Sequence, residues 1–347
     1  MADSKIRVGI IGAGRMGITH HSIINSHPNV EVIAVADSSV VVTSMMKKYL
    51  NVDTYSDYRE LIKKSKPDAL LVCTPPFLNN EILGVAAEAG IHCFVEKPYT
   101  LTYKQASEIS QLFEQKSLVN QVGYVNRFND VFQSVKELVE EEVLGNIFSF
   151  RTEMFSRTVT KPETEGNWRS THANGGGAVY EMASHSIDLI QFILGKPDKV
   201  FGANLTKVHS KNVEDIVSCS FAYKNGMSGL LYVNWSDESY RKPTNKIEIF
   251  GSKGKIFADQ HGYKIYLSEA MPKYNLLEGW NTRYITDIFK PVPFYVRGNE
   301  FTSQLYHFID CLQNRNLKNK CSFKDAMDTL EAIDEIFNDH KRNSIQK

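Results

Sequence analysis

The order of apolar and polar stretches predicts two differently built halves of the chain. Up to about residue 122, short apolar runs alternate with helical stretches, and several of the runs are apolar at consecutive positions. Consecutive apolar positions are expected of parallel strands covered on both faces, and strands that alternate with helices form a doubly wound sheet. We therefore predict an α/β domain over residues 1–123, with strands at 6–11, 30–36, 69–73, 91–95 and 118–122.

Beyond Gly123 the pattern predicts an α+β domain over residues 124–347. A helix near 131–142 precedes a strand at 147–155, an apolar helix at about 179–194, and successive strands between 199 and 268. Asn225-Gly226 is typical of a tight hairpin turn. We expect a largely antiparallel, open sheet that shows one face to a partner. The stretch 269–297 has no clear period and is expected to be loop.

Two amphipathic helices are predicted between about 299 and 340. Apolar residues recur at helical spacing from Phe301 to Leu312 and again from Met327 to Phe337, and Ser322 has the character of an N-cap for the second helix. These helices are candidates to pack back on the first domain.

Size and charge narrow the class of protein. A chain of 347 residues exceeds what one core usually supports, which agrees with two domains. Lys and Arg together number 40, as do Asp and Glu, so no net charge favours a polyanion such as nucleic acid. No apolar stretch approaches the roughly 20 residues that span a bilayer. We therefore expect neither nucleic-acid nor membrane partners.

The cysteines and the start of the chain bear on localisation. Five scattered cysteines, with no spacing typical of a metal site, indicate thiols in a reducing compartment. The first five residues run straight into the first predicted strand and leave no room for a signal peptide. These observations predict a cytoplasmic protein without a bound metal.

The most specific chemical signal is a glycine-rich turn between the first strand and its helix. The turn reads Gly12-Ala13-Gly14-Arg15-Met16-Gly17. In such a turn the first glycine permits a tight bend, the second lets the backbone approach a pyrophosphate, and the third lets helix and strand pack closely. The N–H groups at the helix N-terminus attract phosphate charge. This pattern predicts a dinucleotide-binding fold.

Asp37, which closes the second predicted strand, bears on the choice of cofactor. Its carboxylate can bond the two hydroxyls of an adenosine ribose and would repel the 2′-phosphate of NADP, while Ser38 brings no countercharge. NAD is therefore favoured over NADP. An alternative stays open, because Asp at this position also commonly caps the next helix.

Two further groups of ionisable residues are candidates for catalysis. Glu96-Lys97-Pro98 follows the strand at 91–95, at the sheet edge that faces a ligand in doubly wound folds. A lysine that merely extends from a strand end to solvent is the alternative. Glu181, His185 and Asp188 share one face of a largely apolar helix. Carboxylates one turn from a histidine can orient it for proton transfer, although a satisfied core histidine or a carboxylate–histidine metal site would show the same spacing.

Together these motifs resemble the glucose–fructose oxidoreductase, inositol dehydrogenase and MocA-like family. The resemblance covers nearly the whole chain, and it implies a Rossmann NAD-binding domain and an NAD(P)-dependent dehydrogenase that acts on a sugar, cyclitol or sugar derivative. It rests on the glycine turn, Glu96-Lys97-Pro98, Gly123-Tyr124-Val125-Asn126-Arg127-Phe128, Trp168-Arg169, the triple glycine at 175–177 that leads to His185 and Asp188, Glu214-Asp215, and Gly251-Ser252-Lys253-Gly254.

Residue roles carry over with the resemblance. It implies that Lys97 and His185 flank the reacting carbon and that Glu181 completes a catalytic triad. The positions implied to face the substrate are Lys97, Tyr124, Arg127, Trp168 and His185. The positions implied to bind the cofactor are Gly12, Gly14, Arg15, Met16, Gly17, Asp37, Ser38, Thr74, Pro75, Asn79, Glu96, Lys97, Asn126, Trp168 and Arg169.

The chain departs from the family pattern at two places. Glu181 stands where the family usually has the shorter Asp, which is expected to reposition the proton relay or to fit a substrate of different shape. Pro76 and Asn79 stand where the family tends to have Asn and His. The cofactor contacts of this loop are therefore expected to differ.

The expected reaction is oxidation of a secondary alcohol, in which His185 takes the hydroxyl proton, Lys97 stabilises the alkoxide and Glu181 holds the imidazole. Two alternatives stay open: a nucleotide-sensing regulatory protein that keeps the fold without catalysis, and transient use of NAD for elimination or glycoside cleavage through a keto intermediate. The exposed sheet face predicts a homodimer or homotetramer. Candidates to meet a phosphate or carboxylate of a substrate are Arg127, Arg157, Arg169 and Arg297.

Overall fold

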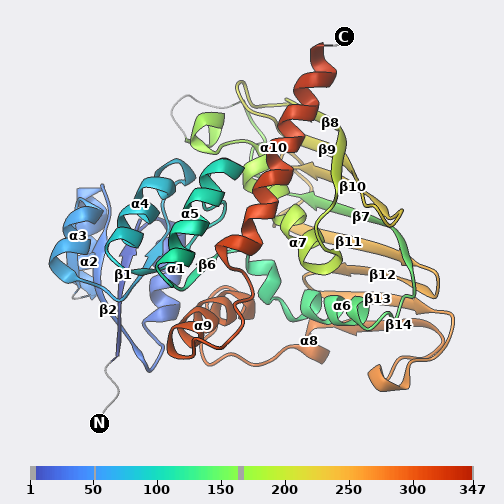
Figure 1. Cartoon of the computed structure of the whole chain (residues 1–347), viewed down its shortest axis with the longest axis horizontal. Helices are drawn as coiled ribbons and strands as arrows, with labels where there is room; N and C mark the ends of the chain where they lie inside the picture. Colours follow the sequence, from blue (N-terminus) through green and yellow to red (C-terminus); the bar gives the residue numbers. More distant parts are fainter. Residues whose placement is uncertain (1–4, 51, 163–167, 346–347) are drawn as a thin grey trace. The chain divides into compact units, whose positions relative to one another are not determined.

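The computed structural model describes residues 5–50, 52–162 and 168–345. The first four residues, on which the expectation about a signal peptide partly rests, lie outside the described residues. Contacts divide the chain into two compact units (Figure 1). The first consists of Met1–Val125 and Pro291–Met327, and the second of Asn126–Lys290 and Asp328–Lys347. Each unit is therefore built from two separate stretches of the chain.

The first unit contains a six-stranded parallel sheet in the order β3-β2-β1-β4-β5-β6, which confirms the predicted doubly wound fold. The first two predicted strands have the observed bounds. β3 has no counterpart among the predicted strands, because three residues are too few to show a period. The strands are β1 Ile6–Ile11, β2 Val30–Ala36, β3 Asp53–Tyr55, β4 Ala69–Val72, β5 His92–Val95 and β6 Asn120–Val122.

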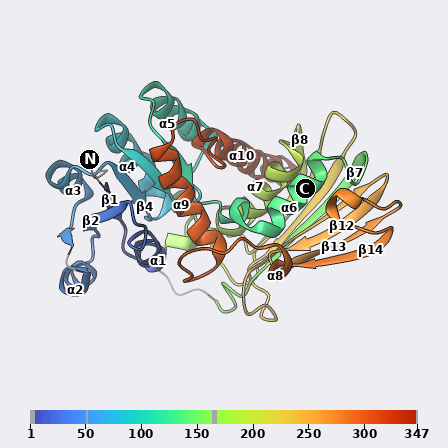
Figure 2. The same ribbon diagram turned by 90° about the horizontal axis from the view of Figure 1, so that it is seen from below.

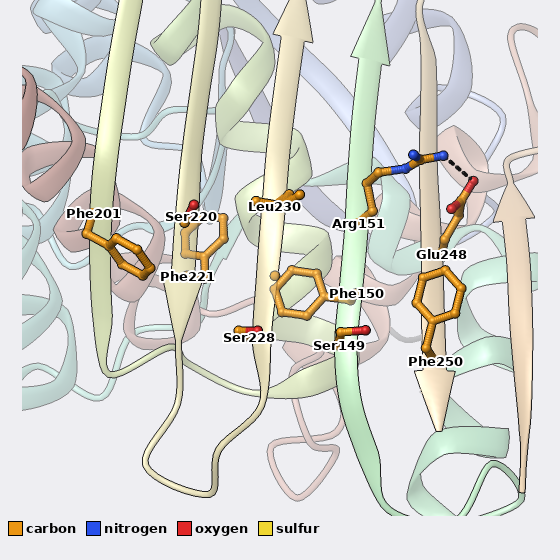
Figure 3. A pocket seen from close by; sticks show the side chains of 11 residues that line it. Ser149, Phe150, Arg151, Phe201, Ser220, Phe221, Ser228, Leu230, Glu248 and Phe250 are labelled. Carbon is orange, nitrogen blue, oxygen red and sulfur yellow. Dashed lines mark hydrogen bonds and ion pairs between the residues drawn. The ribbon is translucent and has the colours of Figure 1, made fainter. Parts of the chain in front are cut away.

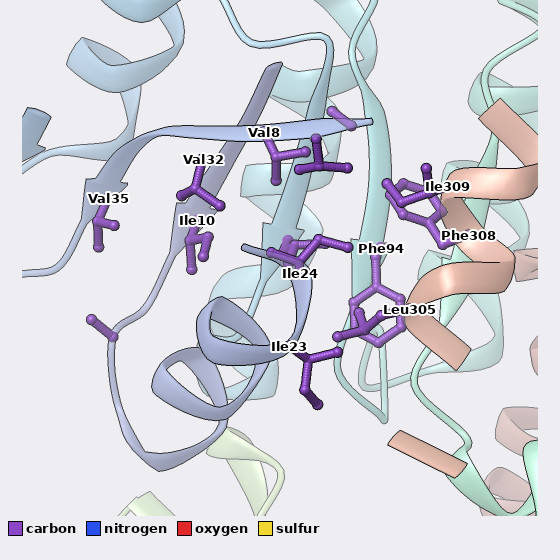
Figure 4. Close-up of a cluster of buried hydrophobic side chains, with 14 of the residues drawn as sticks. Val8, Ile10, Ile23, Ile24, Val32, Val35, Phe94, Leu305, Phe308 and Ile309 are labelled. Carbon is purple, nitrogen blue, oxygen red and sulfur yellow. The ribbon is translucent and has the colours of Figure 1, made fainter. Parts of the chain in front are cut away.

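A helix from the far end of the chain completes the core of this unit. Leu305 and Phe308 of this helix, α9, are fully buried. They pack with Ile23 of α1 and Phe94 of β5 in one continuous cluster (Figure 4). The helices of the unit are α1 Arg15–Ile24, α2 Val40–Leu50, α3 Tyr58–Ser65, α4 Pro76–Glu88, α5 Tyr103–Gln115 and α9 Asn299–Gln313.

The second unit contains an eight-stranded sheet in the order β14-β13-β12-β11-β7-β10-β9-β8. β7 and β10 pair in parallel and the other neighbours pair antiparallel, so the largely antiparallel sheet is confirmed. The strands are β7 Ile147–Phe155, β8 Lys199–Thr206, β9 Ile216–Ala222, β10 Ser228–Asn234, β11 Thr244–Gly251, β12 Gly254–Asp259, β13 Gly262–Leu267 and β14 Gly279–Tyr284.

One prediction for this half is confirmed and one is wrong in part. Asn225-Gly226 turns between β9 and β10, and Gly226 has a φ of +90°, which favours glycine. The expectation of loop over 269–297 is wrong where β14 and the short helix α8 (Ile285–Ile288) occur. β14 forms because it pairs with β13 along its whole length, and such pairing overrides a weak local pattern.

Helices cover only one face of the second sheet. α6 (Asp130–Glu140) and α7 (Ser184–Leu194) lie on that face in Figures 1 and 2. On the other face no helix lies among the described residues, and Leu230, Trp280 and Tyr284 are more than half exposed there.

The last helix, α10 (Phe323–Ile345), packs along the edge strand β8. The backbone N–H groups of Val200 and Ala203 donate to Glu335 and Asp339 at 3.0 and 2.8 Å. Ser322 is the predicted N-cap, since its hydroxyl accepts from the backbone N–H of Asp325. Within the part of the chain that the structure describes, no helix has both the length and the apolar character needed to cross a membrane.

Candidate active site

The parallel sheet of the first unit brings the ends of five strands to one edge, as in other doubly wound folds. The candidate residues that follow β1, β2, β4, β5 and β6 therefore gather there: residues 12–17, Asp37 and Ser38, Thr74 and Pro75, Glu96 and Lys97, and Tyr124. Asn79 and Arg297 also belong to the first unit. The second unit holds the remaining candidates, which are Asn126, Arg127, Arg157, Trp168, Arg169, Glu181, His185 and Asp188.

Gly12 and Gly17 are required by the fold of the glycine turn. Gly12 has a φ of +87°, and a Cβ there would lie 2.8 Å from the carbonyl oxygen of Cys73. A Cβ on Gly17 would lie 1.9 Å from the carbonyl oxygen of Gly12. The first glycine therefore permits the bend, and the third permits the close approach of α1.

Gly14 is different, because the protein itself does not require a glycine there. No atom lies within 4 Å of the position that a Cβ would occupy, and Gly14 is exposed. It is the N-cap of α1, and no side chain caps this helix. An exposed, uncapped helix N-terminus with room above its backbone fits a pyrophosphate group.

Asp37 holds the glycine turn and also the turn that precedes α2. Its Oδ2 accepts a hydrogen bond from the Ala13 backbone N–H at 2.7 Å, and its Oδ1 accepts from the Ser39 N–H at 2.8 Å. The second bond closes a local turn before α2; it does not cap that helix, which begins at Val40 and where the Ser39 hydroxyl accepts from the Val42 N–H at 3.4 Å. Because each carboxylate oxygen has two lone pairs, both can still accept a ribose hydroxyl.

Asn79 links two of the loops at this edge. It is fully buried; its Oδ1 accepts from the Thr74 hydroxyl at 2.7 Å, and its Nδ2 donates to the Pro98 carbonyl at 3.3 Å. The Lys97–Pro98 peptide is cis. Pro76, the other departure from the family pattern, begins α4. Both unusual residues therefore shape the segment that follows β4 at this edge of the sheet.

A buried histidine outside the recognised motifs contacts Glu96. Nε2 of His20 lies 2.6 Å from Oε1 of Glu96, and the two side chains are 0% and 16% exposed. His20 lies on α1 one turn after Gly17, and that spacing is the sequence signal that points to it. A Cβ on Gly123 would lie 3.2 Å from Oε2 of Glu96, so this glycine leaves room for the carboxylate.

Two pKa shifts describe the electrostatics near Glu96. Burial, followed by the Glu96 carboxylate, raises the pKa of the Cys73 thiol, which therefore stays protonated. Burial and the nearby Arg15 guanidinium lower the pKa of Arg297, whereas Glu96 and Glu300 act in the opposite sense. Arg297 thus lies within electrostatic reach of Arg15 and adds positive charge near the N-terminus of α1.

In the second unit, one helix presents a carboxylate and an imidazole. A π-helical turn at Val179–Ala183 runs directly into α7. Between residues 175 and 190 every residue is buried except Glu181 and His185, which are partly exposed. π-helical turns occur frequently at functional sites. Glu181 and His185 are therefore the side chains of this stretch that solvent or a ligand can reach.

The glycines before this helix allow two segments to meet its N-terminus. A Cβ on Gly176 would lie 2.0 Å from the carbonyl oxygen of Arg169. Gly177 has a φ of +103°, and its Cβ would lie 2.4 Å from Oε1 of Glu214. The same oxygen accepts a hydrogen bond from the Val179 N–H at 2.8 Å. Glu214 therefore caps the helix that carries His185.

Arg169 and Glu181 form an ion pair beside the opening of this helix. Nε of Arg169 lies 3.3 Å from Oε2 of Glu181, and the two side chains are 37% and 18% exposed. The guanidinium also stacks on Trp168, 4.3 Å from the ring centroid. The carboxylate that is expected to orient His185 therefore forms an ion pair with Arg169.

Arg127 and Asp188 form a second ion pair, which is buried. Nε of Arg127 lies 3.0 Å from both oxygens of Asp188, and Nη2 lies 2.8 Å from one of them. The side chains are 7% and 0% exposed. Asp188 thus belongs to an internal ion network, which is one of the arrangements that its spacing from His185 allows.

A pocket of about 400 Å³ lies on the outer face of the second sheet (Figure 3). Its lining includes Phe201, Leu230 and an Arg151–Glu248 ion pair of 3.0 Å. This pocket lies across the sheet from α7. Over residues 5–50, 52–162 and 168–345, no group of three or more His, Cys, Asp or Glu side chains is arranged to hold a metal ion.

Comparison with known proteins identifies both halves. Residues 6–124 match the oxidoreductase family with an NAD-binding Rossmann fold, and residues 132–257 match the GFO/IDH/MocA C-terminal domain. A myo-inositol 2-dehydrogenase from Thermotoga maritima is 28% identical over 258 residues, covering 73% of this chain and 75% of that protein. An NAD(+)-dependent scyllo-inositol 2-dehydrogenase from Bacillus subtilis is 22% identical over 328 residues, covering 90% and 87%.

Solved structures share the fold over nearly the full length. A levoglucosan dehydrogenase in complex with NADH and levoglucosan has a TM-score of 0.86 at 21% identity, covering 98% of each chain. The WlbA dehydrogenase from Bordetella pertussis, in complex with NADH and UDP-GlcNAcA, has a TM-score of 0.81 at 20% identity, covering 98% of this chain and 97% of that one.

The fold and the glycine turn define an oxidoreductase with an NAD-binding Rossmann domain. The chain belongs to the Gfo/Idh/MocA oxidoreductase family, which confirms the resemblance drawn from its motifs.

Proposed function

We propose that the protein is an NAD-dependent dehydrogenase that oxidises a secondary alcohol of a sugar, cyclitol or nucleotide sugar. The observation that carries the proposal is the presence of Glu181 and His185 as the partly exposed groups of an otherwise buried helix. The inositol dehydrogenases among its relatives support a polyol substrate. NAD, when bound, accepts the hydride.

The ionisable residues take distinct roles in this proposal. His185 accepts the hydroxyl proton as general base, a contribution typically worth about 10²–10⁴ in rate. Glu181, one helical turn away, orients the imidazole. Lys97 places a positive charge where negative charge develops on the alcohol oxygen. His20 holds the Glu96 carboxylate next to Lys97.

Residues of the first unit would hold the cofactor. The N-terminus of α1, exposed at Gly14 and Arg15, would bind the pyrophosphate. Asp37 would accept the ribose hydroxyls, and its negative charge favours NAD over NADP. Thr74 and Pro75 follow β4 at the same edge of the sheet.

A substrate screen tests this function. The protein is incubated with NAD or NADP and a panel of inositols, aldoses, glucosides and nucleotide sugars, and the reduced cofactor is followed by absorbance. We expect lasting formation of NADH with at least one compound of the panel, and less NADPH. Tight NAD binding without turnover would overturn the proposal in favour of a sensor. Conversion of a substrate without lasting NADH would overturn it in favour of elimination or glycoside cleavage.

We also propose that the protein works in the cytoplasm as a homodimer or homotetramer joined through the outer face of the second sheet. Cys93 and Cys219 are buried thiols, which suits a reducing compartment. The outer face combines the exposed apolar residues Leu230 and Trp280 with charges of both signs, such as Arg151 and Glu248. A face of mixed charge can complement a second copy of itself.

Light scattering after size-exclusion chromatography tests the assembly. Leu230→Glu should lower the mass towards that of one chain, because it buries a charge in the interface. Val208→Glu changes an equally exposed residue outside the strands and should leave the mass unchanged. A wild-type protein that elutes as a single chain would contradict the proposal.

A further inference from the structure

We propose that Glu181 selects an uncharged substrate by neutralising Arg169. The inference rests on the proposed dehydrogenase function and narrows its substrate to a neutral sugar or cyclitol. Compounds that bring a carboxylate or phosphate to the position beside His185 are excluded. A specific pair of side chains in the second unit thus determines the charge of the substrate.

Arg169 is fixed in place from three sides. Its Nε contacts Glu181 at 3.3 Å, and its guanidinium stacks on Trp168. Its backbone carbonyl accepts a hydrogen bond from the Gly177 N–H at 3.2 Å and lies where a Cβ of Gly176 would clash. The position of this arginine is therefore set by the start of the helix that carries His185.

The Arg169–Glu181 pair is a partly exposed charged pair one turn from the proposed general base. Glu181 precedes His185 by one turn on the same helix, and both are partly exposed while the residues between them are buried. A substrate that offers a hydroxyl to His185 therefore brings its neighbouring substituents near the Arg169–Glu181 pair. The charge of this pair bears directly on which substituents are accepted.

The pair accepts hydroxyl groups better than anions. A hydroxyl can donate to the Glu181 carboxylate and accept from the Arg169 guanidinium, whereas an ionised carboxylate can only accept. An anionic substituent must compete with a carboxylate already bonded to Arg169, and it meets the like charge of Glu181. The neighbouring Arg127 offers no alternative, because Asp188 compensates its charge.

The length of Glu181 matters for this arrangement. Asp, the residue that the family resemblance implies here, is one methylene shorter. A shorter arm would draw the carboxylate back from Arg169 and leave more of the positive charge available to an anion. The length of Glu181 therefore contributes to the selection of an uncharged substrate.

Matched pairs of neutral and carboxylate sugars test the inference. kcat/KM is compared for glucose against glucuronate and for a methyl glucoside against the corresponding uronide. The wild type should prefer the neutral member by about ten-fold or more. Glu181→Gln should raise the uronate-to-neutral ratio by about ten-fold, even if both rates fall, and Glu181→Asp should shift it in the same direction by less. Adding Arg169→Met to Glu181→Gln should remove the gain.

Glu248→Gln is the matched control, since Glu248 also pairs with an arginine but lies on the outer face of the sheet; its ratio should equal that of the wild type. The inference is overturned if the wild type prefers the uronates or if Glu181→Gln leaves the ratio unchanged. Calorimetric binding of the same sugars to the NADH-loaded protein, which has no hydride acceptor for an alcohol, measures charge preference without turnover. Absence of turnover would count against the proposed dehydrogenase function, whereas equal binding of neutral and anionic sugars would count against charge selection.

Discussion

The carboxylate of Glu214 accepts a 2.8 Å hydrogen bond from the backbone N–H of Val179, at the N-terminus of the helix that carries His185. The Glu214 side chain is 2% exposed, and its other oxygen lies 3.1 Å from Nε2 of His172. The first N–H groups of a helix have no partner within the helix, and a negative charge there also interacts favourably with the positive end of the helix dipole. This contact between residues 35 positions apart therefore determines where the helix begins.

Glu214→Gln should destabilise the protein and disturb the active site. The loss of a buried, charged acceptor should lower the free energy of unfolding by about 1–3 kcal/mol. Urea denaturation measures this change, and initial rates should fall in the same variant because the start of the His185 helix is less firmly held. Glu269→Gln removes an exposed carboxylate that is paired with Lys253, and it should change stability far less than Glu214→Gln does. Equal stability of the two variants would contradict this role for Glu214.

Gly14 and Gly17 should respond oppositely to alanine. Gly17→Ala places a methyl group against the Gly12 carbonyl and should cost about 1–3 kcal/mol of stability. Gly14→Ala meets no protein atom, so its melting temperature should stay near that of the wild type while NAD binding weakens. Thermal unfolding and fluorescence titration with NAD separate the two effects. Unaltered NAD affinity in Gly14→Ala would show that the pyrophosphate does not bind at this turn.

Asp37→Asn should weaken the preference for NAD. The amide oxygen can still accept the bond from Ala13, but the negative charge that repels a 2′-phosphate is lost. Titration with both cofactors should show a rise in NADP affinity relative to NAD. Asp57→Asn changes the N-cap of α3 and should leave the ratio as it is. A constant ratio in Asp37→Asn would mean that Asp37 only holds the glycine turn and the turn before α2.

His185→Ala should nearly abolish turnover without affecting cofactor binding. Loss of a general base typically lowers the rate by about 10²–10⁴-fold, while the NAD-binding residues of the first unit are unchanged. Steady-state rates and NAD titration measure the two quantities. The exposed His261 provides a control, since His261→Ala should retain the wild-type rate. Full activity of His185→Ala would exclude His185 from the mechanism.

Acid should destabilise the first unit through two histidines. Burial, with a smaller contribution from Arg315, lowers the pKa of His92 from 6.5 to about 4. Burial, with a smaller contribution from Lys320, lowers the pKa of His307 in the same way to about 4. Between pH 4 and 6.5, these histidines therefore bind more protons in the unfolded chain than in the folded protein. The stability is therefore complete above about pH 6.5 and falls as the pH drops towards 4, by at most about 1.4 kcal/mol per pH unit for each histidine.

Denaturant unfolding at several pH values checks this dependence. His307→Gln removes one of the two titrating groups, so the slope of stability against pH should be shallower than in the wild type, whatever its absolute stability. An identical slope would show that His307 titrates alike in the folded and unfolded states.

The sequence predicts those parts of the molecule that local physics determines. β1 and β2 have the predicted bounds because buried parallel strands appear as continuous apolar runs. Gly12 and Gly17 are required for the reasons that the turn pattern suggests. β14 is not predicted, since its pairing with β13 comes from the tertiary fold.

The contacts of the candidate site were less accessible from sequence. His20 and Glu96 are 76 positions apart, and only the parallel sheet brings their loops and helices together. Arg169 and Glu181 are 12 positions apart, but a glycine run of unusual backbone shape lies between them. The sequence suggested Glu96, Arg169 and Glu181 as candidates, whereas His20 and the pairing of these groups depended on topology.

The placement of α9 has a consequence for how the protein is made. Leu305 and Phe308 fill the space beside Ile23 and Phe94, and the backbone of Val122 donates to the carbonyl of Cys321 at 2.9 Å. During synthesis, the interior of the amino-terminal unit therefore stays incomplete until residues 299–313, which form α9, have been made. A product truncated after β6 would expose apolar side chains such as Ile23 and Phe94, which α9 covers in the complete fold. Such a surface would make it a target for chaperones and proteases.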